Sequence, residues 1–409
     1  MITARLKPCA TSDKTSLGPD STYEGETRKD ETYEDETAEM ADKRRLRVVI
    51  AGGGTGGHLY PGIAVAREWM SRSPDTRISF AGTAGGIESR VVPLEGFGLD
   101  LIRSSGLKGK SLKARAHGAA LLLPGLVDAW RLVSKRRPHL VIGVGGYSSG
   151  PVVLVAALRG VPTMLLEQNA MPGLTNRLLA PFVRAAAVAF ESTKSMFGSK
   201  GFVSGNPVRA ELLKTVDLGS ASSDDGRPVV RVLVFGGSQG AHAINVAMVE
   251  AAQELAAHGS GLRLTHQTGP RDREMVRAGY EQAGLAAEVE SFYDDMGQKI
   301  CRADLIVCRA GATTIAEITA AGKAAILVPL PTATDDHQGK NAAALAAVGA
   351  AEVLLQPMMN GHTLAHRIMT LAADPIGRAR MAAAARSLAR PEAARVIVDR
   401  ALELVGSVD

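Results

Sequence analysis

From Arg47 onward the chain alternates short apolar runs with longer segments in which apolar and polar positions mix. In the first half the apolar runs are residues 78–81, 99–102, 140–144, 163–166 and 185–189. Runs that are apolar throughout are typical of strands buried on both faces, in a parallel sheet covered by helices on both sides. The pattern therefore predicts alternating strands and helices in a parallel α/β sheet.

The alternation lapses in a polar stretch over residues 205–228 and then starts again. Residues 229–248 again have the pattern of strand, glycine turn and helix, and further strands are predicted at residues 263–266, 288–290, 304–308 and 324–328. We predict an α/β protein of two Rossmann-like domains, whose parallel sheets face a central cleft. The predicted parts are an N-terminal domain 45–210, a linker 211–228, a second domain 229–390 and a C-terminal helix 391–409 returning to the first domain.

Charge separates the first segment from the rest of the chain. Ten acidic side chains lie between Asp20 and Asp42, against Arg28 and Lys29, so the net charge of +5 combines −8 here with +13 elsewhere. A segment this polar cannot bury enough apolar surface to fold. We predict that residues 1–44 form a disordered acidic extension, and that the basic body has anionic partners such as nucleic acid, nucleotide phosphates or a membrane surface.

Length and composition narrow the class further. A chain of 409 residues is expected to hold two domains. Three scattered cysteines suit neither a disulfide framework nor a zinc site, and fit a reducing compartment. Because the sequence has neither a signal-peptide core nor an apolar run long enough to span a bilayer, we expect a cytosolic protein.

The segment RVVIAGGGTGGHLYPGIAVA, Arg47 to Ala66, predicts a strand, a bare glycine loop and a helix with Pro61 in its first turn. Such a loop presents backbone N–H groups and the positive end of a helix dipole, which suits a phosphate or diphosphate. The loop also fits G-x-G-x-x-G, the motif of dinucleotide-binding proteins, but that motif expects an acidic residue at the end of the second strand. Here no carboxylate follows until Glu88, which disfavours a nicotinamide or flavin cofactor.

The second half repeats this logic in GGSQG, Gly236 to Gly240, where Ser238 adds a hydroxyl donor. The loop suits a nucleotide diphosphate, and the alternative is a tight turn. Arg209 in GNPVR would add a charge-assisted contact to that diphosphate, although a solvated surface arginine is the commoner outcome.

Two further segments follow predicted strands of the second domain. In RAGATTIAEI, Glu317 is expected near the start of a helix, where its carboxylate would accept hydrogen bonds from a ribose; the alternative is a surface glutamate. In PTATDDHQGKNA, His337 and Gln338 suit sugar hydroxyls. A metal site is disfavoured because no second cluster with ligand spacing exists.

The first domain carries two similar segments and a basic one. Glu167, Gln168 and Asn169 follow a predicted strand, and Tyr147 lies in the glycine turn VGGYSSGP. Both are expected at the sheet edge where His58 lies, though each alone would suit a structural turn. Between Lys108 and Arg137, apolar residues have basic residues on both sides. This pattern is typical of a segment that binds an anionic membrane surface, and equally of a core helix with a solvated basic edge.

Taken together, these segments resemble the MurG family of peptidoglycan glycosyltransferases. The resemblance covers residue 47 to the C-terminus and leaves the acidic extension unmatched. It is carried by GGTGGH at 53–58, GGYSSGP at 145–151, EQN at 167–169, GNPVR at 205–209, GGSQGA at 236–241, QTG at 267–269, the AGATTIAE run ending at Glu317, and DDHQGKNA. One departure is Leu166, where the family commonly has a histidine before Glu-Gln-Asn.

The resemblance implies a GT-B fold that binds UDP-N-acetylglucosamine (UDP-GlcNAc) in its second half and the lipid-linked acceptor undecaprenyl-diphosphate-MurNAc-pentapeptide in its first. It implies an anionic membrane surface as a partner, at the cytoplasmic side of the inner membrane, and neither nucleic acid, cofactor nor metal. The donor-binding residues implied are Thr55, Gly56, Gly57, Asn169, Arg209, Ser238, Gln239, Tyr293, Ala312, Thr313, Thr314, Ile315, Ala316, Glu317, His337 and Gln338. The acceptor-binding residues implied are Gly53, Gly54, His58, Tyr147 and Glu167.

The implied chemistry is a single displacement in which the MurNAc C4 hydroxyl attacks the anomeric carbon of the donor and leaves a β-1,4 link. His58 is the expected general base, since its unperturbed pKa lies near neutrality; the alternative is that His58 positions the acceptor phosphate. Three other functions stay open: a GT-B transferase with another acceptor, an NAD-dependent oxidoreductase, and a sugar-nucleotide sensor without catalysis.

Overall fold

The computed structural model describes residues 45–104, 122–217, 229–237, 240–257 and 261–406. Leu46–Asp409 form one compact unit. The predicted acidic extension, residues 1–44, lies outside the described residues.

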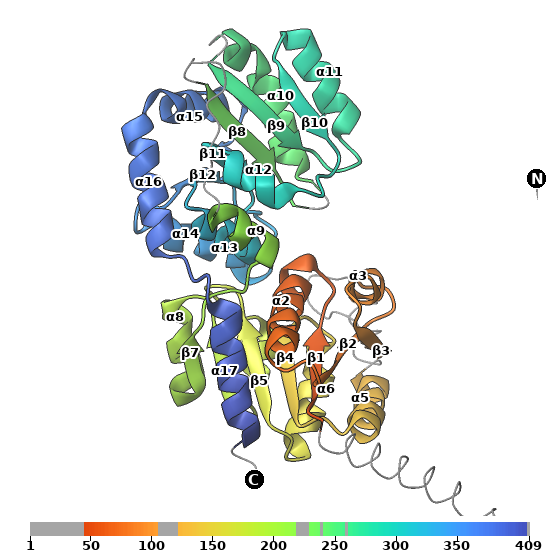
Figure 1. Cartoon of the computed structure of the whole chain (residues 1–409). Coiled ribbons are helices and arrows are strands. Elements are labelled where there is room, and N and C mark those ends of the chain that lie inside the picture. Colours follow the sequence, from red (N-terminus) through yellow and green to blue (C-terminus); the bar gives the residue numbers. More distant parts are fainter. Residues whose placement is uncertain (1–44, 105–121, 218–228, 238–239, 258–260, 407–409) are drawn as a thin grey trace, which may run out of the picture. The chain divides into compact units, whose positions relative to one another are not determined.

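The first sheet has seven parallel strands in the order β3-β2-β1-β4-β5-β6-β7 (Figure 1). They are β1 (Arg47–Gly52), β2 (Arg77–Gly82), β3 (Gly98–Leu101), β4 (Leu140–Gly145), β5 (Thr163–Glu167), β6 (Ala185–Val188) and β7 (Gly201–Val203). Every residue of β4 and β5 is buried, which explains why their sequences are apolar without alternation. The sequence pattern did not predict β7, because three residues at a sheet edge carry no periodic signal.

Helices cover both faces of this sheet. They are α2 (Gly56–Arg72), α3 (Glu88–Leu94), α5 (Leu122–Arg136), α6 (Ser149–Leu158), α7 (Leu174–Leu179) and α8 (Glu191–Lys194), with a 3₁₀ helix η1 (Ser195–Lys200). On one face Leu59 and Trp69 of α2 pack with Ile50 and Ile142 of the strands. On the other face residues of α5 and α6 pack with Val49 and Val141.

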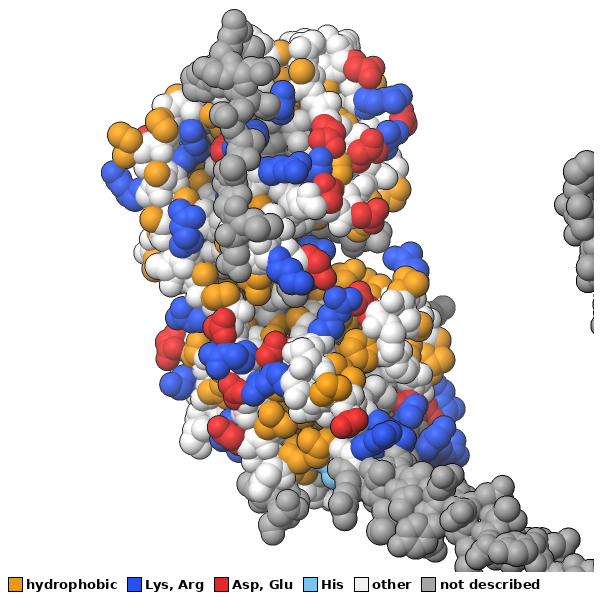
Figure 2. Space-filling model, in the orientation of Figure 1, with side chains coloured by type: hydrophobic (Ala, Val, Ile, Leu, Met, Phe, Trp, Pro, Cys, Tyr) orange, Lys and Arg blue, Asp and Glu red, His pale blue; other side chains and the backbone are white. Residues whose placement is uncertain are grey.

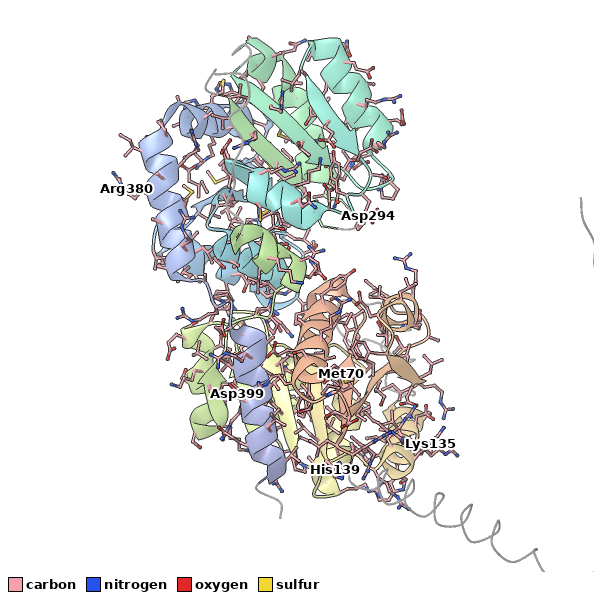
Figure 3. All side chains as sticks on the ribbon, in the orientation of Figure 1. Met70, Lys135, His139, Asp294, Arg380 and Asp399 are labelled. Atoms are coloured by element: carbon pink, nitrogen blue, oxygen red, sulfur yellow. The ribbon has the colours of Figure 1, made fainter. Side chains whose placement is uncertain are left out.

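The last helix of the chain, α17 (Ala393–Gly406), belongs to the first sheet as well. Its buried Ile397 and Val398 pack in one hydrophobic core with Ile50 of β1 and with residues of α2. At the helix surface Asp399, labelled in Figure 3, forms an ion pair of 2.7 Å with Arg72 of α2.

The second sheet has six parallel strands in the order β10-β9-β8-β11-β12-β13. They are β8 (Val230–Phe235), β9 (Leu262–Gln267), β10 (Ala287–Glu290), β11 (Leu305–Cys308), β12 (Ala324–Leu327) and β13 (Glu352–Val353). The associated helices are α9 (Ala210–Asp217), α10 (His242–Ala257), α11 (Arg273–Ala283), α12 (Met296–Arg302), α13 (Ala312–Ala321), α14 (His337–Ala346), α15 (Gly361–Ala373) and α16 (Pro375–Ser387), with 3₁₀ helices η2 (Thr334–Asp336) and η3 (Gln356–Met358).

Helix α9 covers the beginning of the segment that the sequence pattern predicts as a linker. Its Leu212 is buried in a core with Phe235 and Ile306 of the second sheet. The polar part of that segment, residues 218–228, lies outside the described residues.

Both sheets have the strand order of a doubly wound fold, so each has a switch point where the order reverses. In the first sheet it lies between β1 and β4, and in the second between β8 and β11. The loop after β1 passes close over β4: a Cβ on Gly52, whose φ is +151°, would lie 2.4 Å from Val144 Cγ2. Each glycine loop therefore lies at the switch point of its sheet, where such folds bind ligands.

Among the residues that the structure describes, no helix is long and apolar enough to cross a membrane.

Candidate active site

The N-terminus of α2 is open to a ligand. Thr55 occupies the N-cap position without a side-chain cap hydrogen bond, and the helix begins with Gly56 and Gly57. The first N–H groups of a helix have no acceptor within the helix, and here no side chain shields them. Together with the positive end of the helix dipole, they form an anion-binding position.

Glu88, at the start of α3, supports the glycine loop from beneath. Its carboxylate accepts hydrogen bonds from Gly54 N at 2.7 Å, Thr83 N at 2.8 Å and Thr83 Oγ1 at 2.9 Å. The loop closes tightly over it, because a Cβ on Gly53 would lie 2.4 Å from Glu88 Cδ. Burial raises the pKa of Glu88, but these hydrogen bonds outweigh burial and hold it below its ordinary value.

This arrangement bears on how the loop can meet a ligand. In this structure the Gly54 N–H donates to Glu88, whereas no side-chain hydrogen bond caps the start of α2 at Gly56 and Gly57. In the sequence, Glu88 lies too far beyond the second strand to serve as the ribose ligand of a dinucleotide-binding motif. A carboxylate shortly after a Gly-rich strand end was the available signal for its role beneath the loop.

His58 is the third residue of α2, and its tautomer follows from its neighbours. Gln168 Nε2 donates to Val144 O at 3.0 Å, so the Gln168 amide oxygen is turned to His58 Nδ1, 3.3 Å away. Nδ1 therefore carries the proton, and Nε2 has the free lone pair. Burial lowers the pKa of His58 below its ordinary value of 6.5, and the nearby Glu167 opposes this only in part. A neutral imidazole with a free Nε2 is able to accept a proton.

Glu167, at the end of β5, organises the loop that follows it. One carboxylate oxygen accepts from Asn169 N at 3.0 Å and Nδ2 at 3.2 Å. The other accepts from Gly173 N at 3.0 Å and Asn176 Nδ2 at 2.9 Å. The side chain is buried with both oxygens engaged, so Glu167 fixes the shape of the loop that follows β5. Leu166 is buried in the core beside it.

Glu317 and Arg209 contact each other. Arg209 Nη2 and Nε lie 2.8 and 3.0 Å from Glu317 Oε1. Glu317 is the sixth residue of α13, so the expectation that it lies near the helix start, stabilised by the dipole, is wrong. Burial raises the pKa of Glu317, and the charge and hydrogen bonds of Arg209 oppose that rise. The partner of this carboxylate is thus an arginine 108 positions away.

The other residues of the 312–317 run divide between two sides of α13. Thr313 Oγ1 donates to Gly57 O at 3.4 Å, which brings the start of α13 to the glycine loop of the first sheet. Ala312, Ile315 and Ala316 line a cavity described below. Thr314 is half-buried.

Helix α14 begins with His337 and Gln338. In each side chain one polar atom forms a hydrogen bond with the backbone, and the other polar atom has no hydrogen-bond partner among the described residues. His337 Nδ1 lies 2.7 Å from Thr334 O and so carries a proton, which leaves Nε2 as an acceptor. Gln338 Oε1 accepts from Leu330 N at 3.0 Å, and its amide NH₂ remains available to a ligand.

Tyr293 and Tyr147 differ in exposure. Tyr293 is buried; its hydroxyl donates to Glu288 O at 3.3 Å, and Lys299 Nζ lies 4.7 Å from the ring centroid. Tyr147 is about half exposed, and its backbone oxygen accepts from Ser104 Oγ at 2.9 Å.

The glycine loop of the second sheet is described only in part, because Ser238 and Gln239 lie outside the described residues. Gly240 has a φ of +74°, and a Cβ there would lie 1.9 Å from Thr268 O. Only glycine fits this turn, which leads into the N-terminus of α10.

Asn341 belongs to the polar cluster DDHQGKNA, but the sequence assigned it no role in the site. This fully buried residue of α14 accepts a hydrogen bond from Ala170 N at 2.8 Å. Its Nδ2 donates to Asn169 Oδ1 and Ala310 O, both at 3.2 Å. It joins the loop after β5 to the segment after β11. An asparagine between a lysine and a run of alanines was the only signal, and it did not reveal these partners.

The site thus combines an uncapped helix N-terminus, a neutral histidine and a buried carboxylate next to an arginine. Two doubly wound parallel sheets with glycine loops at their switch points define the GT-B class of glycosyltransferases. The oxidoreductase alternative loses support, because β2 ends at Gly82 and the next carboxylate, Glu88, is held beneath the loop.

The chain belongs to glycosyltransferase family 28. Residues 48–188 match the family 28 N-terminal domain and residues 231–397 its C-terminal domain. A relative from Geotalea uraniireducens is 48% identical over 87% of this chain and 97% of its own length. One from Myxococcus xanthus is 45% identical over 88% of this chain and 93% of its own. Both carry the name UDP-N-acetylglucosamine–N-acetylmuramyl-(pentapeptide) pyrophosphoryl-undecaprenol N-acetylglucosamine transferase.

Solved structures agree. The crystal structure of Acinetobacter baumannii MurG is 31% identical, covers 88% of this chain and 99% of its own, and has a TM-score of 0.72. A UDP-GlcNAc 2-epimerase from Neisseria meningitidis has a TM-score of 0.62 over 88% of this chain and 100% of its own; at 13% identity it shares the fold alone. The resemblance to the MurG family and the expected GT-B fold are confirmed.

Proposed function

We propose that this protein transfers GlcNAc from UDP-GlcNAc to the C4 hydroxyl of MurNAc in undecaprenyl-diphospho-MurNAc-pentapeptide, with inversion to a β-1,4 link. The observation that carries this proposal is the 45–48% identity to relatives named for this transfer, over 87–88% of the chain. The two glycine loops support it independently, since both substrates contain a diphosphate and each loop leads into a helix N-terminus.

On the donor side, UDP lies along the second sheet in our proposal. Glu317 accepts hydrogen bonds from the ribose diol, and Arg209 then contacts the diphosphate, so that donor binding separates the Arg209–Glu317 pair. Ser238 and Gln239 contact the same diphosphate, and Tyr293 lies beside the uracil. The free polar groups of His337 and Gln338 bind GlcNAc hydroxyls, together with Asn169 and Thr55.

On the acceptor side, the lipid diphosphate binds at the glycine loop 53–57, on the N–H groups that open α2. This places the acceptor near His58, with Tyr147 at the edge of the same site. His58 Nε2 removes the proton from the C4 hydroxyl as its oxygen attacks the anomeric carbon. The bond from that carbon to the UDP oxygen breaks at the same time, and UDP leaves with both electrons, stabilised by Arg209 and a helix N-terminus.

The lipid acceptor also requires contact with a membrane surface, and α5 is suited to it. Leu123, Val127 and Trp130 recur at helical spacing, and Leu123 and Trp130 are 75% and 56% exposed. Lys135 and Arg136 lie in the last turn, and Figure 2 shows Lys and Arg side chains gathered over this region. An exposed apolar stripe next to basic residues fits an anionic membrane surface on the cytoplasmic side. The preceding basic residues, 108–117, lie outside the described residues.

Incubation with radiolabelled UDP-GlcNAc and either the lipid-linked MurNAc-pentapeptide or diacylglycerol tests the proposal. We expect label to move only into the diphosphate-linked lipid, as followed by chromatography. Transfer to diacylglycerol alone would assign another acceptor. Binding of UDP-GlcNAc without any transfer would make the protein a sensor.

A further inference from the structure

A cavity lies where the chain passes between its two sheets. Its volume is about 150 Å³, whereas a single water needs roughly 10–15 Å³. The two segments that connect the sheets both line the cavity. They are residues 203–208, which precede α9, and residues 388–390, which precede α17. Ala189 to Glu191, one face of α13 and part of α14 complete the wall.

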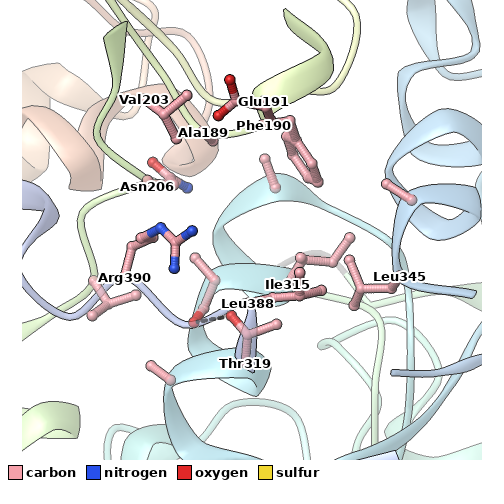
Figure 4. Close-up of a pocket in the computed structure, with 16 residues that line it drawn as sticks. Ala189, Phe190, Glu191, Val203, Asn206, Ile315, Thr319, Leu345, Leu388 and Arg390 are labelled. Atoms are coloured by element: carbon pink, nitrogen blue, oxygen red, sulfur yellow. Dashed lines mark hydrogen bonds between the residues drawn. The ribbon is translucent and has the colours of Figure 1, made fainter. Parts of the chain in front are cut away.

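The cavity contains a buried amide without a partner. Asn206 is only 6% exposed, yet neither its Nδ2 nor its Oδ1 has a hydrogen-bond partner among the described residues. Figure 4 shows the amide at the wall of the cavity. Leaving a buried donor and acceptor unpaired is costly, so a ligand that supplies both an acceptor and a donor would gain from filling the site. Asn206 belongs to GNPVR, of which the proposed function uses only Arg209.

Side chains of both charges line the same cavity as this amide. In Figure 4 Asn206 lies between Arg390 and Glu191. The Arg390 guanidinium donates to the neighbouring Ala389 O at 3.1 Å and has no carboxylate partner among the described residues. The Glu191 carboxylate is exposed and 3.8 Å from Lys194 Nζ, a weak pair. A cation, an anion and an amide with both functions thus border one cavity.

The rest of the wall is apolar. Phe190, Ile315, Leu345 and Leu388 contribute large side chains, and the Thr319 hydroxyl is already engaged with Ala316 O at 3.0 Å. This part of the cavity has room for a small hydrocarbon group but offers it no polar partner.

We propose that the cavity binds a small α-amino acid with an apolar side chain. The carboxylate accepts from the Arg390 guanidinium and Asn206 Nδ2, and the ammonium group donates to Asn206 Oδ1 and Glu191. The side chain lies against Ile315 and Leu345. A zwitterion supplies a partner for both atoms of the unpaired Asn206 amide, and its two charges match the Arg390 guanidinium and the Glu191 carboxylate. A simple carboxylate or amine does this only in part.

The cavity lies on the face of α13 that does not carry Glu317, although Ala312, Ile315 and Ala316, which line it, are among the donor-binding residues that the family resemblance implies. Successive residues of a helix are about 100° apart. Ala312, Ile315, Ala316 and Thr319 therefore share one face of α13, and Glu317 points away from it. An amino acid in the cavity would contact both connecting segments, and it would not compete directly with a donor bound at Glu317.

Calorimetry and saturation-transfer NMR on the full chain, with L-valine as the probe, test the proposal. We expect a dissociation constant of about 0.1–1 mM, which suits a ligand of this size. The analogues 3-methylbutanoate, without the ammonium group, and isobutylamine, without the carboxylate, should each bind about tenfold more weakly or worse.

Two variants connect the binding to the cavity. Arg390→Gln should weaken valine binding at least about tenfold. Asn206→Leu should abolish it and raise the melting temperature of the free protein, since it replaces an unpaired buried amide by an apolar group of similar size. Arg395→Gln, on the exposed side of α17, is the matched control and should bind like the wild type.

Three outcomes would overturn the proposal. They are the absence of saturable binding for glycine, alanine, valine and leucine; binding of 3-methylbutanoate as tight as that of valine; and unchanged binding by Arg390→Gln.

Discussion

At the scale of single residues, the chemistry depends on environments that the surrounding fold imposes. His58 is neutral because burial lowers its pKa, and its Nε2 is free because Nδ1 faces the Gln168 oxygen. Burial raises the pKa of Glu317, and the neighbouring Arg209 opposes that rise. Each side chain owes its state to a partner that is distant in sequence.

We expect His58→Ala to lower kcat about 10²–10⁴-fold, the usual contribution of a general base. Because the base must be deprotonated and its pKa lies below 6.5, wild-type kcat should be level at neutral pH and fall only at more acidic pH. Steady-state kinetics across pH measure both effects. His362→Ala, at an exposed position of α15, is the control. If His58→Ala turns over like the wild type, the assignment as base is wrong.

Glu317→Gln should raise KM for UDP-GlcNAc by about 10–100-fold, the value of a charged hydrogen bond, with a smaller effect on kcat. The variant should fold, since its partner Arg209 is 37% exposed and remains solvated. The matched control is Glu274→Gln, which removes a carboxylate that pairs with Arg277 on the surface of α11. An unchanged donor KM would contradict the ribose contact.

At the scale of elements, junctions between strands and helices hold the site in shape. The loop from β1 to α2 rests on Glu88, and α10 and β9 share a buried polar network. In that network His266 Nε2 donates to Asn245 Oδ1 at 3.1 Å, and Tyr280 Oη donates to His266 Nδ1 at 2.8 Å.

Glu88→Gln replaces a charged acceptor by an amide whose NH₂ group must face the backbone N–H of either Gly54 or Thr83. We expect a loss of stability of about 1–3 kcal/mol and a rise in KM for the lipid acceptor that exceeds the rise for the donor. Thermal unfolding and separate substrate titrations measure the two effects. Glu95→Gln, at the other end of α3, removes a surface carboxylate paired with Arg67 and is the control. Equal rises in both KM values would contradict a role specific to the glycine loop.

The buried His266 makes stability depend on pH. Burial lowers its pKa from 6.5 to about 3, so protons bind the unfolded chain more readily than the folded one. Its contribution to stability is complete above pH 6.5 and is lost as the pH falls, by about 1.4 kcal/mol per pH unit at most. Denaturation between pH 7 and 5 should show this slope. It should flatten in His266→Gln and persist in His366→Gln, an exposed control on α15.

At the scale of the whole molecule, contacts between the two halves complete the site. Asn341 of the second half binds Ala170 and Asn169 of the first, and Thr313 reaches Gly57. The same contacts between the two halves therefore hold in position both the residues proposed to bind the donor and those proposed to bind the acceptor.

Asn341→Ala should lower the melting temperature and kcat together, because it leaves the Ala170 N–H and Ala310 O unpaired, at about 1–3 kcal/mol each. Differential scanning calorimetry and steady-state kinetics measure the two. Asn360→Ala removes the N-cap of α15 and should lower the melting temperature with little effect on kcat. A loss of kcat as large in Asn360→Ala would show that stability alone limits turnover.

Much of the fold follows from local pattern. The predicted strands coincide with β1 to β6 and with β8 to β12. Most of them are apolar, and a strand buried on both faces is visible in a few consecutive residues. Strands β7 and β13, with three and two residues, carry no such signal. The glycine motifs were visible for the same reason, because a tight turn needs glycine at fixed positions.

Residue order alone determines most of the elements, the two-domain α/β class and the motifs that carry the chemistry, because each depends on neighbours within a few positions. Only the folded chain decides that Glu88 takes the Gly54 N–H across 34 positions, that Arg209 pairs with Glu317 across 108, and that Asn341 holds Ala170 across 171. The physical reason is that hydrogen bonds and burial act over a few ångströms in space, whatever the separation in sequence.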